Sequence, residues 1–315
     1  MSDQIAVLRL MGALQARAWS FDGIARVAAG AALLAFSWSA IAPEGVFMSD
    51  VGGQREAEGE SLGRAATLGG REVQVGAYGG VSYTHPSTVS VENPGKTDLR
   101  IDGVNWIGRP FKSPIYYGLR ILAWGPLGRL GGMVDFTHAK AISVPSQEAT
   151  FTGMRNGQPV PPKARVGDVF RHLEFSHGHN LLTLNALVRL GTFLGRVRPY
   201  AGVGGGVAIP HTEVGFAGER ERTYEYQYAG LAWQALAGIE VRLGRASIFF
   251  EYKFTFAPYA VPLSLTHTGG LLVGDLWRQL QAWLSGRAPP GGTLRTTLVT
   301  QHAVSGVLVR VAGPQ

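Results

Sequence analysis

From residue 71 onward, large apolar residues alternate with small or polar ones, and this period of two most constrains how the chain can fold. Ile248, Phe250 and Tyr252, for example, alternate with Glu251 and Lys253. Successive side chains of a β-strand point to opposite faces, so the pattern predicts strands with one apolar and one polar face. The same alternation recurs at 71–83, 182–189 and 234–242.

The polar face of these segments differs from that of a water-soluble β-sandwich. It holds glycine, amides and a few balanced charges, and the whole chain of 315 residues has 44 glycines and only 16% charged residues. The apolar face is continuous and ends in aromatic residues. This combination is typical of a barrel with lipid outside and a polar lumen inside.

Composition excludes several other classes of protein. With no cysteine the chain can form no disulfide scaffold, thiolate zinc site, iron–sulfur cluster or cysteine nucleophile. A hydrophobic share of 45%, without a Gly-X-Y repeat, excludes disorder and collagen. The net charge is +7, but the basic residues are scattered and form no nucleic-acid module, so we expect no nucleic-acid partner.

The N-terminal region has the features of a secretory signal. Arg9, Arg17 and Arg26 precede an uncharged run at 27–42 that ends in small residues. The alternative is a single anchoring helix, but the run is shorter than the roughly 20 residues that a span needs. We therefore expect a signal peptide at 1–42, a flexible lead-in at 43–70 and an outer-membrane barrel at 71–311.

The spacing of the strands predicts the topology. Short connections near 125–130, 191–197 and 243–245 alternate with long ones near 85–114, 143–177, 210–227 and 259–295. Periplasmic turns and extracellular loops alternate in this way. The fold class is therefore all-β: an eight-stranded antiparallel transmembrane outer-membrane β-barrel with four long extracellular loops. The predicted strands are 71–84, 115–124, 131–142, 178–190, 198–209, 228–242, 246–258 and 296–311.

A ninth strand-like segment, 98–106, would break the even number of strands that such barrels have, so we assign it to an extension of the first long loop. An eight-stranded barrel has an interior that side chains just fill, which argues against a diffusion pore. Charged residues placed inside it must be paired. We expect such a structural network among Arg120, Arg189, Arg242, Lys253, Asp135, Glu240 and Glu251.

The histidines fall in the predicted long loops or at the outer ends of strands. They are His85, His138, His172, His177, His179, His211, His267 and His302. One interpretation is that histidine simply avoids the lipid-facing region. The other is a cluster at the outer rim, joined by Glu174, Glu213, Glu225 and Lys140, that binds a divalent metal or moves protons near neutral pH.

Two further patterns have competing interpretations. The glycines at 202–206 resemble a dinucleotide-binding loop, but no βαβ unit follows, so we interpret them as small residues for close strand packing. Apolar residues between Leu272 and Leu284 follow a helical period inside the last long loop. That segment is either an interfacial helix on the outer leaflet or a cap on the barrel.

Several motifs, in this order and spacing, resemble the lipid A oxidase family of Gram-negative outer membranes across about 75–311. They are WIGRPF at 106–111, PIYYGLR at 114–120, VDFTHAK at 134–140, LEFSHGHNLLT at 173–183, RPYAG at 198–202, IPHTEV at 209–214, YEYQ at 224–227 and FEYK at 250–253. His172 and His179 depart from the usual family positions, and 270–292 is an apparent insertion.

The resemblance implies an OmpA-like eight-stranded barrel in the outer membrane of a Gram-negative bacterium. Its implied activity is the oxygen-dependent oxidation of the proximal glucosamine of lipid A to 2-aminogluconate, with release of hydrogen peroxide. It also implies a divalent metal and molecular oxygen as acceptor, with no flavin or NAD. The implied partners are lipid A or lipopolysaccharide of the outer leaflet, and the barrel-assembly machinery during biogenesis.

Carried over onto this sequence, the resemblance implies catalytic roles for His138, His177, His211, Glu213 and Glu174. Of these, His177, His211 and Glu213 are also the implied metal ligands.

The residues that the resemblance implies in substrate binding are Lys140, His85 and Glu225. Two other classes of function compete with the oxidase. One is a non-enzymatic, OmpA-like structural or interaction barrel, and the other is a narrow channel or lipid-binding barrel. Close packing of the rim His and Glu residues would favour the oxidase.

Overall fold

The computed structural model describes residues 71–266 and 270–313. The predicted signal peptide at 1–42 and lead-in at 43–70 lie outside the described residues. No helix in the described part of the chain has both the length and the apolar character needed to cross a membrane.

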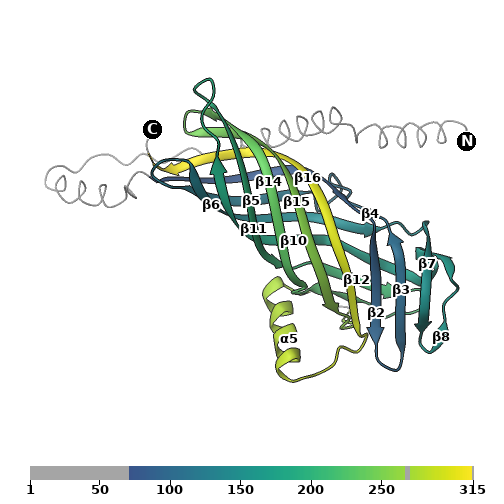
Figure 1. Cartoon of the computed structure of the whole chain (residues 1–315). Coiled ribbons are helices and arrows are strands. Elements are labelled where there is room, and N and C mark those ends of the chain that lie inside the picture. Colours follow the sequence, from purple (N-terminus) through teal and green to yellow (C-terminus); the bar gives the residue numbers. More distant parts are fainter. Residues whose placement is uncertain (1–70, 267–269, 314–315) are drawn as a thin grey trace, which may run out of the picture.

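Eight long strands pair in sequence order, each antiparallel to the next, and the last pairs with the first (Figure 1). This closes them into a ring, which removes the sheet edges. The ring consists of β1 (Glu72–Thr84), β5 (Tyr117–Trp124), β6 (Leu130–Ser143), β10 (Phe170–Arg189), β11 (Val197–Ala208), β14 (Gly230–Leu243), β15 (Ala246–Pro262) and β16 (Thr293–Ala312).

Short connections join the ring strands at one end, which we call the short-turn end. They cover 125–129, 190–196 and 244–245. β1 begins and β16 ends at this same end, where Val73 pairs with Ala312. The long connections therefore all lie at the opposite end of the barrel.

Three of the four predicted long loops contain strands and the fourth contains the helix Leu272–Leu284, so these connections are not simple loops. The sheet continues from the outer half of β16 into β2, β3 and β7, and 98–106 falls largely in β3, outside the ring. These additional elements are β2 (Ser87–Asn93), β3 (Thr97–Val104), β4 (Trp106–Ile107), β7 (Glu148–Arg155), β8 (Gln158–Pro159), β9 (Lys163–Arg165), α4 (Val166–Val169), β12 (His211–Phe216), β13 (Thr223–Tyr226) and α5 (Leu272–Leu284).

Two ring strands extend further toward the long-connection end than the sequence predicted. β10 begins at Phe170 rather than at 178, and β15 ends at Pro262 rather than at 258. The extra residues of β10 pair with β12 of the extension, and those of β15 pair with the outer end of the ring strand β16. Their partners come from distant parts of the chain, and a local pattern of alternation does not identify them.

Two apolar clusters fill the interior and follow one another along the barrel axis. The outer cluster lies in the extension and includes Leu99, Ile101 and Phe175, all fully buried. The inner cluster lies in the ring and includes Trp124 and Phe249. The described side chains therefore fill the barrel, which disfavours the channel hypothesis.

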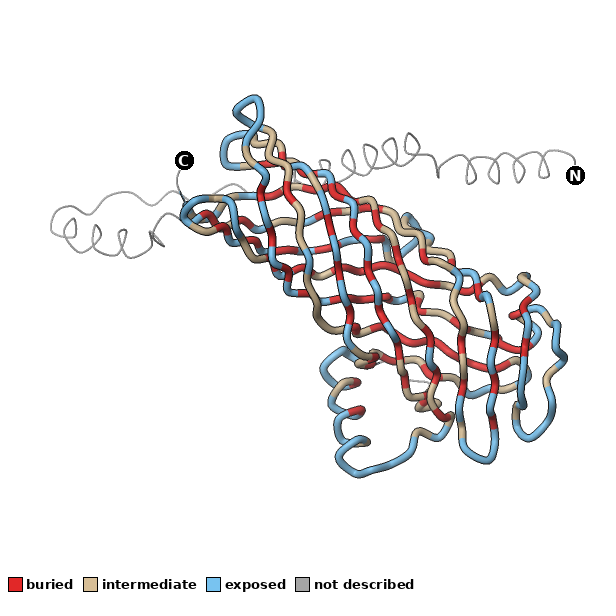
Figure 2. Tube along the Cα trace, viewed as in Figure 1, coloured by how far each residue is buried: buried red, intermediate tan, exposed pale blue. Residues whose placement is uncertain are grey.

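The expected alternation of faces is confirmed. Leu182 and Leu184 are 41% and 67% exposed, whereas Thr183 and Asn185 between and beside them are buried. Figure 2 shows the same alternation of buried and exposed positions along the ring strands. We call the exposed outward-facing apolar side chains of the ring the apolar belt; it includes Leu119, Ile121, Val134, Leu182, Leu184, Val203, Leu231, Trp233, Phe250, Tyr252, Phe254 and Phe256.

Paired charges occupy the lumen, and the expected network forms except at Arg242, for which no ion pair is described. Arg120 contacts Asp135 at 3.1 Å and Glu251 at 2.8 Å, and Lys253 contacts Asp135 at 2.8 Å. The side chains of Arg120, Asp135 and Lys253 are fully buried. Nearer the short-turn end, Arg189 pairs with Glu240 at 3.0 Å. The first group has two positive and two negative charges, so it is neutral as a whole.

Alternate glycines of β11 face the lumen and allow close contact with β10. A Cβ on Gly204 would overlap the backbone of Leu184 and Asn185, and one on Gly206 would overlap Leu182 and Thr183. The glycines at 202–206 are thus packing residues inside a strand. The structure supports that interpretation over a dinucleotide-binding loop.

Candidate functional site on the outer wall

The candidate site lies on the outward face of the extension, not in the lumen. On β10, Leu173 and Phe175 point into the outer apolar cluster, so His172 and Glu174 point the other way. On β12, Val214 belongs to the same buried cluster, which places its neighbour Glu213 on the outward face.

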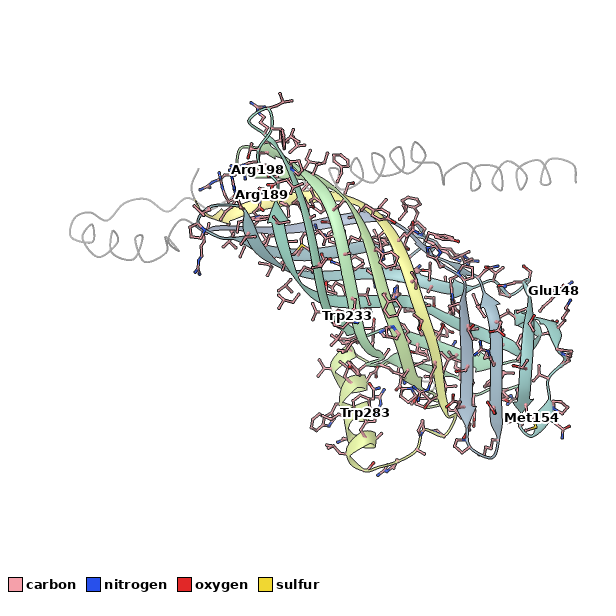
Figure 3. The ribbon with its side chains drawn as sticks, in the orientation of Figure 1. Glu148, Met154, Arg189, Arg198, Trp233 and Trp283 are labelled. Atoms are coloured by element: carbon pink, nitrogen blue, oxygen red, sulfur yellow. The ribbon has the colours of Figure 1, made fainter. Side chains whose placement is uncertain are left out.

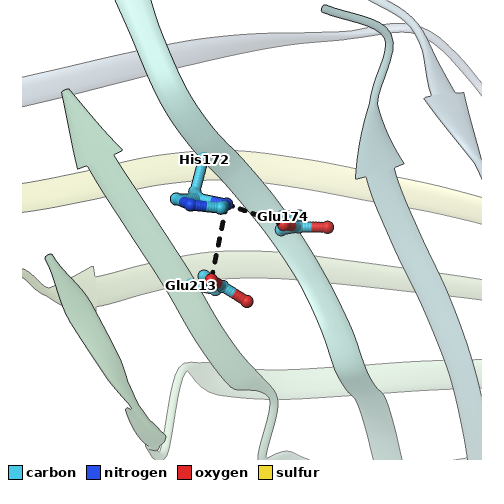
Figure 4. A group of neighbouring side chains, drawn as sticks. All are labelled: His172, Glu174 and Glu213. Carbon is cyan, nitrogen blue, oxygen red and sulfur yellow. Dashed lines mark hydrogen bonds and ion pairs between the residues drawn. The ribbon is translucent and has the colours of Figure 1, made fainter. Parts of the chain in front are cut away.

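Two carboxylates face each other at the centre of this site. Glu174 and Glu213 are directly paired across β10 and β12. Like charges at opposed positions destabilise a sheet unless cations compensate them. His172 Nδ1 lies 3.1 Å from Glu174 Oε1 and 3.4 Å from Glu213 Oε1. Dashed lines mark both contacts in Figure 4. Arg222 donates a further hydrogen bond to Glu213.

Two more histidines extend the site. His177 Nδ1 lies 3.9 Å from Glu213 Oε2, and its ring centroid is 5.0 Å from that of His211. Tyr224 packs edge-on against both rings, and its hydroxyl lies 3.3 Å from His177 Nε2. Tyr226, paired with His211 across β12 and β13, also packs edge-on against it, with 4.7 Å between ring centroids. We call His172, Glu174, His177, His211 and Glu213 the outer-wall cluster.

His177 owes its position to an irregularity in β10. The register between β10 and β6 shifts between Phe175 and His179, which leaves the intervening residues unpaired. Gly178 within this bulge has φ +147°, a conformation that side chains disfavour. The side chain of His177 is 45% exposed, whereas that of Glu213 is 6% exposed. The bulge thus presents one imidazole of the cluster to the surroundings.

His211 is buried, and its Nδ1 has no hydrogen-bond partner among the described residues. Burial, with a smaller contribution from His177, lowers the pKa of His211 to about 4. His211 is therefore neutral at pH 7 and can accept a proton or bind a metal through a nitrogen lone pair.

His138 and Lys140 lie on the same outward face of β6. His138 stacks on Tyr117 at 4.7 Å and its Nδ1 lies 2.8 Å from Asn180 Oδ1, while its Nε2 is buried without a described partner. Lys140 Nζ donates to the carbonyl of Lys112 at 2.7 Å.

The structure places the other two predicted substrate-binding residues elsewhere. His85 lies beyond β1, with its Nε2 2.8 Å from Gln301 Nε2, and no described contact joins it to the outer-wall cluster. Glu225 lies on the opposite face of β13 from Tyr224 and Tyr226. It accepts hydrogen bonds from Gln227 and Arg278 there.

The remaining histidines are not part of the site. His302 points into the lumen and contacts the hydroxyl of Tyr116 at 3.0 Å, so the expectation that every histidine lies at the rim or in a loop is wrong for it. His179 contacts the hydroxyl of the buried Tyr259. His267 lies outside the described residues.

Sequence reasoning missed His172 and Arg222 as members of the site. His172 and Glu174 are two residues apart on one strand, so they share a face. That spacing was visible in the sequence. Their closeness to Glu213 was not, because it depends on the register of β10 against β12.

Three residues of the outer-wall cluster have the ligand types and spacing that a divalent metal needs. His172, Glu174 and Glu213 can each offer one ligand atom, and these atoms lie within 4.8 Å of one another. Imidazole and carboxylate ligands together suit zinc, iron, manganese or copper. His211, two residues before Glu213 on β12, has a buried Nδ1 without a described hydrogen-bond partner.

Comparison with known proteins gives no family assignment. No family model and no curated protein matches the chain. Among solved structures, the crystal structure of Neisserial surface protein A is similar, with 12% identity and a TM-score of 0.30 over 76% of this chain and 97% of that one. A FadL homologue from Pseudomonas aeruginosa has 15% identity and a TM-score of 0.23 over 76% of this chain and 49% of its own. Likenesses this distant do not bear on function.

Proposed function

We propose that this chain is an outer-membrane barrel of a Gram-negative bacterium and that its outer-wall cluster oxidises lipid A. The observation that carries the proposal is the position of the cluster. It lies on the outside of the wall, just beyond the apolar belt, where the sugar head group of an outer-leaflet lipid would meet the protein.

The apolar belt supports the membrane location. Leu119, Leu184, Val203 and Trp233 are each more than half exposed, and they face outward around the ring. Water-soluble proteins seldom expose continuous apolar patches larger than a few hundred Å². A hydrocarbon surrounding would bury these side chains, and barrels of this kind carry such a band.

The orientation follows from the connections. Outer-membrane barrels have short periplasmic turns and longer extracellular segments. The short-turn end therefore faces the periplasm, and the extension with the outer-wall cluster faces outward. This orientation brings the cluster to the level of the outer-leaflet head groups.

The reaction oxidises the hemiacetal carbon C1 of the proximal glucosamine. The C1–H bond and the hydroxyl O–H bond break, and two electrons and two protons pass to molecular oxygen to give hydrogen peroxide. The resulting lactone adds water and opens to 2-aminogluconate, so the lipid gains one oxygen atom overall. A redox-active divalent metal, when bound, would supply the path for electrons to oxygen.

The described residues have separate parts in this scheme. Glu174, Glu213 and His172 would hold the metal. His211, buried and with a free Nδ1, is placed to take the hydroxyl proton. His177 is exposed and lies between His211 and Glu213, so it can pass that proton outward. Lys140 would orient the anionic or polar head of the lipid, together with the neighbouring Lys112 and Arg109.

The test uses the purified, detergent-folded protein incubated in air with lipid A that lacks the 1-phosphate. Mass spectrometry should detect a gain of one oxygen, and hydrogen peroxide should appear in equal amount. A chelator should abolish both signals, and an added divalent metal should restore them.

The matched variants are Glu213→Gln in the cluster and Glu148→Gln, an exposed residue of β7 at the far end of the extension (Figure 3). Glu213→Gln should lose the activity, and Glu148→Gln should keep it. Folding of both is checked by the shift in gel mobility of the unheated barrel. If folded protein gives no product with several lipid A forms and metals, the non-enzymatic interaction barrel is the correct alternative.

A further inference from the structure

A pocket of about 330 Å³ opens at the short-turn end, at the opposite end of the barrel from the outer-wall cluster. Its charged lining consists of Arg129, Arg189, Arg198, Arg242 and Glu72. Figure 3 shows Arg189 and Arg198 together at this end. We call this the basic pocket.

The basic pocket has an excess of positive charge. Four arginines and one glutamate give a net lining charge of +3. Two arginines share the Glu72 carboxylate. Its Oε2 accepts a hydrogen bond from Arg189 at 3.4 Å and another from Arg198 at 3.3 Å. Glu240, outside the lining, takes a third hydrogen bond, from Arg189 at 3.0 Å. No ion pair is described for Arg129 or Arg242.

Several buried polar atoms around the pocket have no hydrogen-bond partner among the described residues. They are Nε of Arg189, Nε of Arg198 and Oε1 of Glu72. Buried polar groups without partners are costly. An anion with several acceptor oxygens would balance the excess of arginine donors in the lining, and the guanidinium fork suits the oxygens of a phosphate group.

The turns that border the basic pocket are apolar at their tips. Leu127, part of the pocket lining, is 89% exposed, and Phe193 and Leu194 on the neighbouring turn are 55% and 94% exposed. A molecule with a phosphate group and an apolar tail would fit both features. The pocket would hold the phosphate, and the turns would contact the tail.

We propose that the basic pocket binds a phosphate group. The phosphate belongs either to a phospholipid of the adjacent leaflet or to a soluble phosphate ester, and the apolar turns favour the phospholipid. This site is independent of the oxidase proposal, because it shares no residue with the outer-wall cluster and lies at the other end of the barrel.

The test measures binding to the full chain in detergent micelles by native mass spectrometry and calorimetry. The probes are phosphatidylglycerol and, as the soluble ester with the same kind of head group, glycerol 3-phosphate. Tighter binding of the lipid than of the ester would assign the site to a phospholipid, and equal binding would assign it to a soluble phosphate compound. Binding of neither probe would overturn the proposal.

Substitutions in the lining test whether the phosphate binds in the basic pocket. The double variant Arg129→Gln with Arg242→Gln removes two cations that have no described ion pair, so the barrel should still fold, and affinity should fall at least tenfold. Arg245→Gln is the matched control, since Arg245 lies at the same end but outside the lining. It should change affinity less than twofold.

Glu72→Gln gives a second test in the opposite direction. It removes the single carboxylate of the lining and releases Arg189 and Arg198 from it, so phosphate affinity should rise severalfold. A general affinity of a basic protein for anions would instead respond equally to Arg129→Gln, Arg242→Gln and Arg245→Gln. That pattern, or unchanged binding in Glu72→Gln, would refute the pocket as the site.

Discussion

Lys253 is the side chain whose removal tests most directly whether the lumen network holds the barrel together. Its fully buried ammonium group donates to Asp135 Oδ2 at 2.8 Å, to the Tyr78 hydroxyl at 2.6 Å and to Thr137 Oγ1 at 3.0 Å. Lys253→Met keeps an unbranched side chain, one atom shorter than that of lysine, and removes its charge. The four-charge group then carries one uncompensated negative charge inside the barrel.

The expected loss in the free energy of unfolding can be bounded. Removing one partner of a buried ion pair typically destabilises a protein by about 3–5 kcal/mol, because the remaining charge stays buried without compensation. Adding Asp135→Asn to Lys253→Met restores neutrality. The double variant should therefore lose less stability than the sum of the two single variants, with a coupling energy of about 1–3 kcal/mol.

The assay is reversible urea unfolding of the barrel in lipid vesicles or detergent, followed by tryptophan fluorescence and gel mobility. Lys163→Met on the exposed β9 is the control and should stay within about 0.5 kcal/mol of the parent. If Lys253→Met also stays within about 1 kcal/mol, or if the two single changes are additive, the network is not a coupled structural unit and the reasoning is refuted.

Further predictions concern the outer wall and α5. In chelator-treated protein, the low pKa of His211 means that the unfolded chain binds a proton between pH 6.5 and 4 while the folded chain does not, so the unfolding free energy should fall as pH drops through this window. His211→Phe should flatten that dependence, and an unchanged pH profile would contradict the assignment. Glu213→Gln should weaken divalent-metal binding, measured by calorimetry, by at least about tenfold, or 1.4 kcal/mol. If α5 lies in the membrane interface, brominated lipid should quench the fluorescence of Trp277 and Trp283 as well as that of Trp233 in the apolar belt; quenching of Trp233 alone would support the cap.

Side-chain hydrogen bonds attach α5 to the barrel on one side of the helix. Asp275 accepts a hydrogen bond from the backbone of Tyr226, and Gln279 exchanges two hydrogen bonds with the backbone of Tyr228. These contacts hold one side of the helix against the segment after β13. Trp277 and Trp283 are exposed on the helix, which is the feature that the fluorescence experiment uses.

Much of the ring was predictable because it depends on a local pattern. At positions such as Leu184 and Asn185, alternation along one strand already indicates which side faces outward. The same local reasoning gave the helix at Leu272–Leu284, where apolar residues follow a helical period. It also identified Arg120, Asp135 and Lys253 as lumen residues, because each lies between outward-facing neighbours.

The outer extension was not predictable in the same way. β2 pairs with the outer end of β16, near the other end of the described chain, and β3 pairs with β7 across a ring strand pair, so these partners are not neighbours in the sequence. The bulge that turns His177 outward depends on a register shift of β10 against β6. A pattern within one segment does not encode such a shift, since pairing register is set between strands.

The sequence by itself therefore determined most of the wall of the barrel, which side of each strand faces outward, and which charges, apart from Arg242, meet in the lumen. Only the tertiary structure decided that His172 joins Glu174 and Glu213, that Glu225 faces away from them, and that Arg129, Arg189, Arg198 and Arg242 surround one pocket. The reason is physical. The face of a strand follows from the geometry of its own backbone, whereas a site built from several strands depends on registers and turns that only the closed barrel fixes.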